Sequence, residues 1–393
     1  MMAADSTTWE RVPIVDLCAE HVDCVNRTAP VVDEPSPFKM IRTTNVRNGF
    51  IDTDNVKYVS EETYKRWTRR LVPKRGDVIL TREAPLGDAG KVRSDDHIFL
   101  GQRLYHFRPD PNKLDADFLL YALMAPDLQG QIMALGSGST VEHMRLGDIP
   151  SLEIEAPTLS VQRRIGGILS AYDELIENNQ RRIKILEEMA RSLYRQWFVH
   201  FRFPGHDKVK MVPSPLGPIP QGWEVKNVKE VLARRTAGQV YREEDVVLEG
   251  TVPVIDQSTN ELLGFHDKEP DHLATPENPI AIFGDHTCKM QLLVEPFSIG
   301  PNVVAFEANV DRPISYLFHI VRSLVQTQEY KRHWSQLTAK EIVLADKLTA
   351  EQFTTSIQPS LQEVEVLRKA NRVLRRTRDL LLPRLLSGNL SLN

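Results

Sequence analysis

Residues 158–201 read TLSVQRRIGGILSAYDELIENNQRRIKILEEMARSLYRQWFVHF. Apolar side chains recur here in alternating steps of three and four residues, the heptad spacing of a helix that packs along one narrow seam. Such a helix is roughly 60 Å long, which is more than one compact domain can bury, so it needs a partner. The seam positions are Val161, Ile165, Ile168, Tyr172, Leu175, Asn179, Ile183, Leu186, Ala190, Leu193 and Trp197.

A second heptad-like stripe lies in residues 349–386 and predicts that partner. Each seam carries one asparagine, Asn179 or Asn371, which weakens a buried seam but fixes its register. The simplest arrangement is an antiparallel pair whose second helix ends at Pro383 and Gly388. The alternative is that each helix packs on its neighbouring globular part. The second seam comprises Ile357, Leu361, Val364, Leu367, Asn371, Leu374, Leu381 and Leu385.

The globular parts of the chain repeat. Trp9 and Trp223 are each followed by glutamate and then by apolar residues at the same spacing. Strand-like runs at 101–107 and 300–306 also correspond, and each precedes a short apolar helix. Two copies of a globular part followed by a long helix predict pseudo-twofold symmetry.

These patterns predict an α+β fold, in which two globular α/β domains are separated by two long helices packed as an antiparallel coiled coil. The expected parts are a first domain, a central helix, a second domain and a distal helix. Their expected boundaries are 1–156, 157–203, 204–347 and 348–393.

The composition is that of an ordinary globular protein, with 393 residues, 41% hydrophobic and 26% charged. No apolar run has the length of a membrane span, and no signal-peptide pattern opens the chain. Cys18, Cys24 and Cys288 form no disulfide framework or zinc pattern. We therefore expect free thiols in a cytoplasmic protein without membrane contact.

The net charge of −4 argues against a polybasic protein, but the charge is unevenly distributed. Residues 1–38 hold seven Asp and Glu against two Lys and Arg, whereas residues 39–108 hold 15 Lys and Arg against nine Asp and Glu. A local basic field on an acidic protein suits a nucleic-acid-binding face. The alternative is that mixed charge only solvates the surface.

The sequence offers little for catalysis. It contains no Gly-rich dinucleotide fingerprint, no phosphate-binding loop with its lysine, and no paired His or Cys metal motif. A single-chain nuclease or methyltransferase would need acidic metal ligands or a cofactor loop. A pure coiled-coil scaffold would not need two loop-rich domains with interleaved basic residues. The pattern favours a non-catalytic, metal-free binding protein.

Several short motifs follow one another along the chain. They are IRTTNV at 41–46, GDVILTREAPLG at 76–87, LGQR at 100–103, GSGST at 136–140, QRRI at 162–165, LYRQWFV at 193–199 and LPRLLSG at 382–388. In this order they resemble the motifs of the specificity subunits of type I restriction–modification systems. The second domain lacks counterparts of TREAP and GSGST, as expected if the two domains read different half-sites.

The resemblance implies two target-recognition domains, each of which reads half of a split site in double-stranded DNA. It also implies helical regions that set the spacer and bind two modification subunits. Those partner subunits would carry S-adenosylmethionine and the methyl-transfer chemistry, so this chain needs no cofactor of its own. Restriction subunits join some such complexes.

Sequence is read in the major groove by Arg on guanine and by Asn or Gln on adenine, while phosphate contacts position the protein. The alternatives are that a candidate Arg forms a surface ion pair and that Asn45 is a turn residue. The candidates are Arg42, Thr43, Asn45, Arg47, Arg82, Gln102, Arg103, Ser139, Thr140 and His143 in the first domain, and Gln257, Ser258, His286, Lys289 and His333 in the second.

Two features of the central helix remain open. Its end is rich in aromatic and basic residues that could dock a modification subunit, although aromatic residues at helical spacing commonly face a core. Together, Gly166 and Gly167 lower the stability of the helix by about 2 kcal/mol relative to two alanines. They could allow a close helix crossing or a bend, or they could simply be tolerated. The docking candidates are Arg181, Arg182, Arg191, Tyr194, Trp197 and Phe198.

Overall fold

The computed structural model describes residues 9–138, 142–258, 262–326 and 332–388. The chain divides into two compact units. The first unit comprises residues 1–178 and 371–393, and the second comprises residues 179–370. Both units therefore contain parts of the two long helices, α4 (Leu159–Tyr194) and α8 (Lys347–Leu386).

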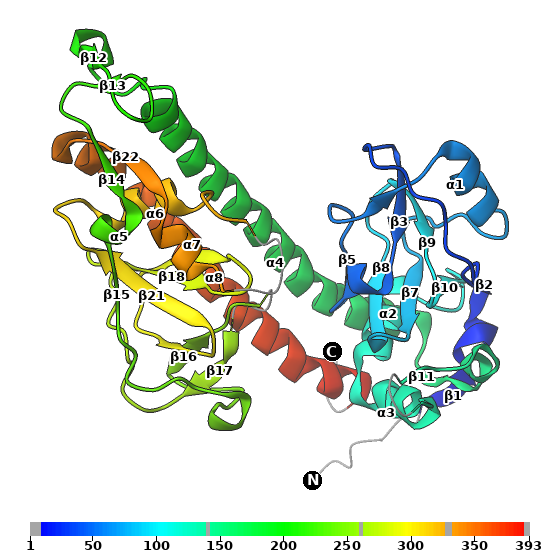
Figure 1. Cartoon of the computed structure of the whole chain (residues 1–393). Helices are drawn as coiled ribbons and strands as arrows, with labels where there is room; N and C mark the ends of the chain where they lie inside the picture. Colours follow the sequence, from blue (N-terminus) through cyan, green and yellow to red (C-terminus); the bar gives the residue numbers. More distant parts are fainter. Residues whose placement is uncertain (1–8, 139–141, 259–261, 327–331, 389–393) are drawn as a thin grey trace. The chain divides into compact units, whose positions relative to one another are not determined.

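The first unit is built on a four-stranded antiparallel sheet in the order β2-β10-β7-β8 (Figure 1). A second sheet has the order β6-β3-β9, in which β3 and β9 are parallel. The strands are β1 (Glu10–Pro13), β2 (Cys18–Asp23), β3 (Phe38–Ile41), β4 (Val46–Arg47), β5 (Phe50–Ile51), β6 (Lys57–Tyr58), β7 (Val78–Arg82), β8 (Leu86–Lys91), β9 (His97–Leu100), β10 (Leu104–Pro109) and β11 (Glu153–Ala156). The helices are η1 (Ile14–Leu17), η2 (Thr43–Asn45), α1 (Glu61–Trp67), α2 (Ala116–Met124), α3 (Pro126–Leu135) and η3 (Leu146–Ser151).

The second unit has an equivalent four-stranded sheet, β15-β21-β18-β19, and a second sheet, β17-β16-β20, in which β16 and β20 are parallel. The strands are β12 (Met211–Val212), β13 (Ile219–Pro220), β14 (Glu224–Asn227), β15 (Leu232–Arg234), β16 (Val252–Ile255), β17 (Leu262–His266), β18 (Ile280–Gly284), β19 (Met290–Leu293), β20 (Ser298–Ile299), β21 (Val303–Ala308) and β22 (Glu341–Leu344). The helices are η4 (Arg195–Val199), η5 (His206–Lys208), α5 (Val228–Val231), η6 (Glu243–Asp245), α6 (Ile314–Val321) and α7 (Trp334–Thr338).

The matching strand orders confirm the internal repeat. In the first unit, β1 pairs with β11 so that Glu10 faces Ala156. In the second, β14 pairs with β22 so that Glu224 faces Leu344. Each of these strand pairs leads directly into a long helix, α4 after β11 and α8 after β22. Ala156 and Leu344 are thus equivalent positions from which the two helices can be aligned.

The two long helices pair antiparallel, as predicted. In the first unit, Asp173 in α4 binds Arg378 near the end of α8. In the second, Glu187 near the end of α4 binds Arg368 of α8. Ion pairs therefore join the beginning of one helix to the end of the other in the first unit, and the pairing continues in the second.

The helices also pack on the globular parts. Pairing with each other and packing on a neighbouring globular part, the two expected arrangements, therefore both occur. In the first unit, Ile165 and Leu169 of α4 share a core with Leu382 of α8 and Phe118 of α2. In the second unit, Phe353 of α8 shares a core with α4 and α6 residues. Both helices therefore contribute residues to the core of each unit.

The predicted seam needs one correction in α4. Leu175 is 52% exposed, whereas Asp173 is fully buried. The buried face of this part follows Ile165, Leu169, Asp173 and Ile176 rather than a strict heptad. The helix contacts a globular core as well as α8, so its buried face is wider than a coiled-coil seam. Asn179 and Asn371 are buried, as expected.

Both long helices end close to the predicted positions, with two differences in detail. The α-helical part of α4 ends at Tyr194 and continues as the π-helical turn η4. Pro383 does not end α8, which runs to Leu386. Proline lacks an N–H and its ring crowds the carbonyl four residues earlier, here that of Asp379. Asp379 is exposed, so water can bind the carbonyl that loses its hydrogen bond.

The glycine pair of α4 serves two different purposes. A Cβ atom on Gly166 would lie 2.7 Å from the Asp115 carboxylate and 3.0 Å from the Phe118 nitrogen, at the N-terminus of α2. A Cβ on Gly167 would meet nothing within 4 Å. Gly166 thus allows α4 to lie directly against the first turn of α2, and Gly167 is merely tolerated.

We expect Gly166→Ala to lower the free energy of unfolding by about 1–3 kcal/mol, because the added methyl overpacks the α2 contact. Gly167→Ala should instead raise it by roughly 0.5–1 kcal/mol through helix propensity. Chemical denaturation of the two variants measures both changes. Equal effects of the two substitutions would contradict the close-crossing explanation.

No single helix of the described residues is long and apolar enough to cross a membrane. In the part of the chain that the structure describes, α2 and α3 reach that length and composition only when taken together, and they meet at a bend of 64°.

Candidate nucleic-acid interface

In the first unit, three segments meet where β7 ends and β10 begins. The Arg82 nitrogen donates to the Arg103 carbonyl at 2.9 Å, and the Met144 nitrogen donates to the Arg82 carbonyl at 2.9 Å. Arg103 has a positive φ of 68°, and Ala84 has one of 50° before a cis peptide bond to Pro85. This edge of the sheet therefore collects the loops that the sequence singled out.

The second unit repeats this edge bond for bond. The Asp285 nitrogen donates to the Asn302 carbonyl at 2.8 Å, and the His333 nitrogen donates to the Asp285 carbonyl at 2.9 Å. Asn302 has a φ of 60°. Asp285, Asn302 and His333 are therefore the equivalents of Arg82, Arg103 and Met144.

Four candidates of the first unit are exposed: Arg42, Arg47, Gln102 and Arg103. The Arg103 guanidinium lies 3.0 Å from the Glu83 carboxylate, and its side chain remains 46% exposed. Surface ion pairs of this kind are weak, so the guanidinium can exchange partners.

The remaining candidates of the first unit lie in less open positions. Thr43 and His143 are half-buried. His143 exchanges backbone hydrogen bonds with Ser137. Ser139 and Thr140 lie outside the described residues.

Two of the first-unit candidates are buried and hold the loops in place. Arg82 is 7% exposed, and its guanidinium donates to the Met144 carbonyl at 2.9 Å. Asn45 is 4% exposed; its side-chain oxygen accepts from the Arg42 nitrogen, and its amide donates to the Asn55 carbonyl. Asn45 therefore acts as the turn residue that the alternative reading described, and Arg82 ties two loops together.

The second-unit candidates gather in one loop cluster. The Gln257 side-chain oxygen accepts from the His286 nitrogen at 3.1 Å. The Lys289 ammonium donates to the Ser258 carbonyl at 2.5 Å. His333 is only 1% exposed, so its side chain is not presented to solvent.

A groove beside this cluster contains arginines that the sequence reading did not single out. Its lining includes Arg234, Arg235 and Arg332, and its volume is about 370 Å³. The adjacent arginines at the end of a strand were a signal in the sequence. The role of these arginines depends on which strand they follow, and the fold is needed to identify that strand.

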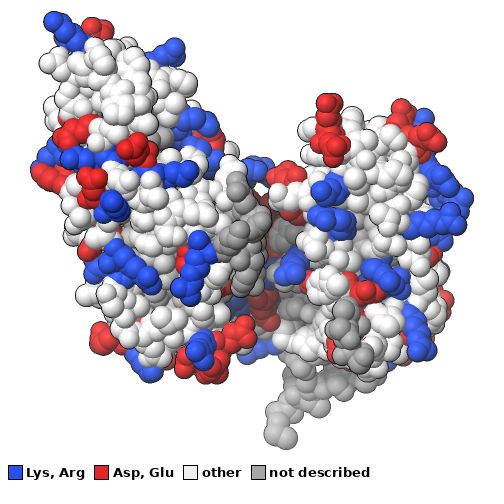
Figure 2. Space-filling view, in the orientation of Figure 1, with Lys and Arg blue, Asp and Glu red and all other residues white. Residues whose placement is uncertain are grey.

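Charged side chains cover the visible face of each unit without forming one continuous basic surface (Figure 2). Lys and Arg side chains alternate there with Asp, Glu and uncharged residues. On this face the basic residues form only small local groups. Among the described residues, no group of three or more His, Cys, Asp or Glu side chains could hold a metal ion.

The docking candidates at the end of the central helix divide into two kinds. Arg182 pairs with Glu363 at 2.5 Å and Arg191 pairs with Glu188 at 2.9 Å, on side chains that are 51% and 42% exposed. Arg181 is also exposed. These basic residues lie on the outer face of the helix.

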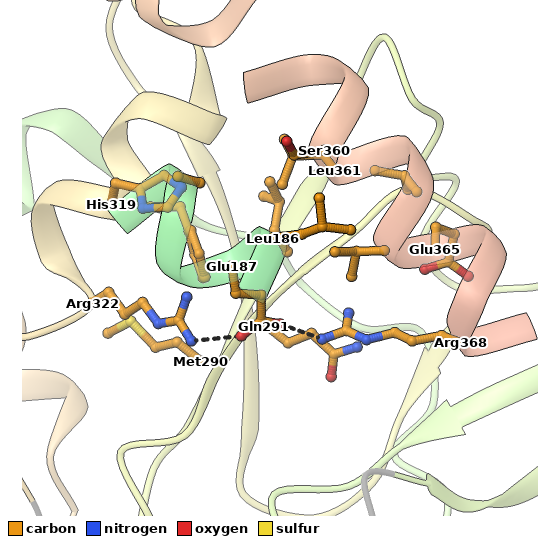
Figure 3. Close-up of a pocket in the computed structure, with 15 residues that line it drawn as sticks. Leu186, Glu187, Met290, Gln291, His319, Arg322, Ser360, Leu361, Glu365 and Arg368 are labelled. Carbon is orange, nitrogen blue, oxygen red and sulfur yellow. Dashed lines mark hydrogen bonds and ion pairs between the residues drawn. The ribbon is translucent and has the colours of Figure 1, made fainter. Parts of the chain in front are cut away.

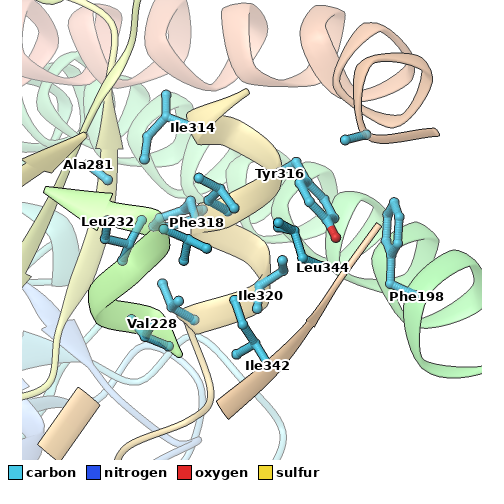
Figure 4. Packing of buried hydrophobic residues seen from close by; sticks show 14 of the residues in the cluster. Phe198, Val228, Leu232, Ala281, Ile314, Tyr316, Phe318, Ile320, Ile342 and Leu344 are labelled. Carbon is cyan, nitrogen blue, oxygen red and sulfur yellow. The ribbon is translucent and has the colours of Figure 1, made fainter. Parts of the chain in front are cut away.

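The aromatic docking candidates pack inward. Phe198 is 6% exposed and lies in the core of the second unit, where Figure 4 shows it beside Tyr316 of α6. Tyr194 and Trp197 pack against the same core, and burial raises the pKa of the Tyr194 hydroxyl. Their surroundings match the core alternative.

A buried charge cluster joins the helices of the first unit to its globular part. The Asp173 carboxylate accepts from the Tyr121 hydroxyl at 2.7 Å and from the Arg378 guanidinium at 2.5 Å. Arg93 approaches the same carboxylate at 3.5 Å. Burial alone would lower the pKa of Arg378, but the charge and hydrogen bond of Asp173 raise it overall.

The second unit has a small cavity at the corresponding place, between α4, α6, β19 and α8 (Figure 3). Glu187 points toward Arg322 and Arg368 there and pairs with both, at 3.2 and 2.9 Å. Burial lowers the pKa of His319 to about 3, so this imidazole is neutral at physiological pH. The cavity volume of about 40 Å³ has room for a few waters rather than a cofactor.

Comparison with known proteins agrees with this architecture. Residues 8–188 match the family described as type I restriction modification DNA specificity domain. The MjaIX type I restriction enzyme specificity subunit of Methanocaldococcus jannaschii is 22% identical over 356 residues, covering 84% of this chain and 81% of the relative. A putative type I specificity subunit of Mycoplasma genitalium is 31% identical over 174 residues, which are 42% of each chain.

A solved structure extends the likeness of fold to both halves of the chain. The crystal structure of a type I S subunit from M. genitalium covers 98% of both chains, with a TM-score of 0.56 and 17% identity. That structure and the M. jannaschii relative span both units, whereas the family match covers the N-terminal part of the first unit and the beginning of the second. The first part of the chain thus matches the type I restriction modification DNA specificity domain, and the chain is similar over most of its length to specificity subunits of type I restriction–modification systems.

Proposed function

We propose that each unit reads one half of a bipartite DNA site in the major groove. The observation that carries this proposal is the internal repeat, with the same sheet edge built twice from the same backbone hydrogen bonds. The exposed side chains at the two edges differ, with Arg103 in the first unit and Asn302 at the equivalent position in the second. Different side chains on one scaffold suit two different half-sites.

The two long helices set the spacer between the half-sites and dock two modification subunits in this proposal. Those partners bring S-adenosylmethionine and transfer the methyl group, and restriction subunits complete the assembly where they are present. The exposed arginines Arg181, Arg182 and Arg191 are the docking residues that the packing leaves accessible.

The test is a methylome with and without this gene, in cells that retain the modification subunit. We expect a split, asymmetric methylated motif that disappears on deletion. A motif that persists, or one that is continuous or palindromic, would refute the bipartite reading by this chain.

Arg103 is the first-unit side chain best placed to read a base. Arg103→Ala should cost about 1–3 kcal/mol of binding and relax the methylated motif at one position. Lys65→Ala is the matched control, since the Lys65 side chain is 72% exposed and pairs with its helical neighbour Glu61. A loss that is equal for all DNA sequences would make Arg103 a phosphate contact instead.

A further inference from the structure

The arginine groove of the second unit lies where β15 ends and β21 begins. Its polar lining residues are Arg234, Arg235, Thr236, Asp285, Asn302 and Arg332. Arg234, Asn302 and Arg332 are exposed. The volume of about 370 Å³ is far larger than the few waters of a structural cavity, so the groove can admit part of a ligand.

The charges of the lining leave the groove basic. Three arginines face one aspartate among the lining residues. The Asp285 carboxylate accepts from the backbone nitrogens of His333 and Trp334, at 2.9 and 2.8 Å, so it is engaged in holding the groove wall. Arg235 pairs with Glu307 beside the groove. Arg234 and Arg332 are the two guanidinium groups best placed to meet an anion.

The repeat places this groove at the edge already assigned to DNA reading. Asn302 is equivalent to Arg103, and both are held by the same backbone hydrogen bond in the same left-handed conformation. Counting along β21 and β10 from these two residues aligns Phe306 with Phe107. Phe306 faces Arg234 across the sheet, whereas Phe107 faces His21. Arg234 is thus a feature of the second unit that the first unit does not copy.

We propose that this groove holds the phosphate backbone of duplex DNA at the second half-site, through Arg234 and Arg332. A guanidinium matches a phosphate with two parallel hydrogen bonds and keeps its charge at every relevant pH. Exposed Asn302 lies in the same groove, where a side-chain amide can reach a base edge once the backbone is seated. This assignment rests on the proposed function.

The experiment compares the Arg234→Gln/Arg332→Gln double variant with the wild-type chain, each purified with its modification subunits. Binding to duplex DNA is measured across a salt series, and the complex is footprinted with hydroxyl radicals. The logarithmic salt slope should shrink by about one per lost phosphate contact, on specific and random DNA alike. Protection should weaken over one half-site and persist over the other.

Lys226→Gln is the control, because Lys226 is a cation of the same unit on β14, a strand that does not line the groove. An unchanged slope and footprint in the double variant, with normal wild-type binding, would overturn the groove assignment alone. If the double variant lost the modification subunit but kept its footprint, the groove would bind a protein partner, and the groove assignment would again be overturned.

Failure of the wild-type complex to bind a bipartite duplex would instead refute the proposed function. Both arginines are exposed, and the single variants give the same readout should the double variant not fold.

Discussion

Asp173→Ala should lower the free energy of unfolding of the first unit by about 3 kcal/mol, because it removes the buried counter-ion of the Arg378 guanidinium and leaves it the exposed Asp379 carboxylate instead. Arg378 is 7% exposed and Asp173 is fully buried, so solvent cannot replace the lost partner. The Tyr121 hydroxyl loses its acceptor in the same step. Denaturant unfolding followed by circular dichroism measures the change.

The neighbouring acid provides a control for this prediction. Glu174 is exposed on the same turn of α4, and Glu174→Ala should change stability by less than about 0.5 kcal/mol. Similar unfolding midpoints for the two variants would show that the cluster does not stabilise the unit.

The second unit suggests a double substitution that should restore the stability lost in Asp173→Ala. Counting along the helices from the equivalent residues Ala156 and Leu344 aligns Asp173 with Leu361, and Arg378 with Ala190. One unit thus has an ion pair where the other has apolar side chains. The Asp173→Leu/Arg378→Ala double variant should therefore be more stable than Asp173→Ala, since an apolar replacement leaves no unpaired charge. A double variant that is less stable than either single one would contradict this account.

Phe198→Ala should destabilise the second unit by about 3–5 kcal/mol, the usual cost of removing a buried phenylalanine. Its ring lies 4.7 Å from that of Tyr316, 5.2 Å from Phe353 and 5.7 Å from Trp223, measured between ring centroids. The side chain therefore joins η4, the continuation of α4, to the core that α6 and α8 build. Thermal and denaturant unfolding of the full chain measure the loss.

Val199→Ala is the matched control, because Val199 is the next residue and is 54% exposed. It should leave stability nearly unchanged. A Phe198→Ala chain that keeps its stability but no longer co-purifies with the modification subunit would reverse the assignment and make Phe198 a docking residue. Loss of both properties together would reflect the damaged core.

Local patterns were sufficient to predict the repeat and the two helices. The heptad spacing and the pair of Trp-Glu dipeptides each lie within a short stretch, so they can be read without the fold. Side-chain roles were harder because they depend on distant partners. The carbonyl that binds Arg82 lies 62 residues away, and Arg378 lies 205 residues from Asp173. A charged residue on an otherwise apolar helix face looks like an exposed residue until such a partner is known.

Distance in the sequence also explains why the arginines of the groove were not singled out. Arg234 and Arg332 are far apart in the sequence and line one groove only because β15, β21 and the segment before α7 meet in the second unit. Asn45 was singled out for its chemistry, but its hydrogen bonds are satisfied within its own loop. Residue type therefore pointed to one edge of the sheet, and packing determined which side chains remain exposed there.

The interleaving of the two units has a consequence for synthesis. Leu382 and Leu385 of α8 belong to the core that Phe118 and Ile165 begin. At 5–20 residues per second, a ribosome needs roughly 10–40 s to proceed from residue 178 to residue 371, and only then can that core be completed. The core of the first unit therefore remains incomplete until α8 has left the ribosome. We expect the nascent chain to expose apolar surface during this interval and to be a substrate for chaperones.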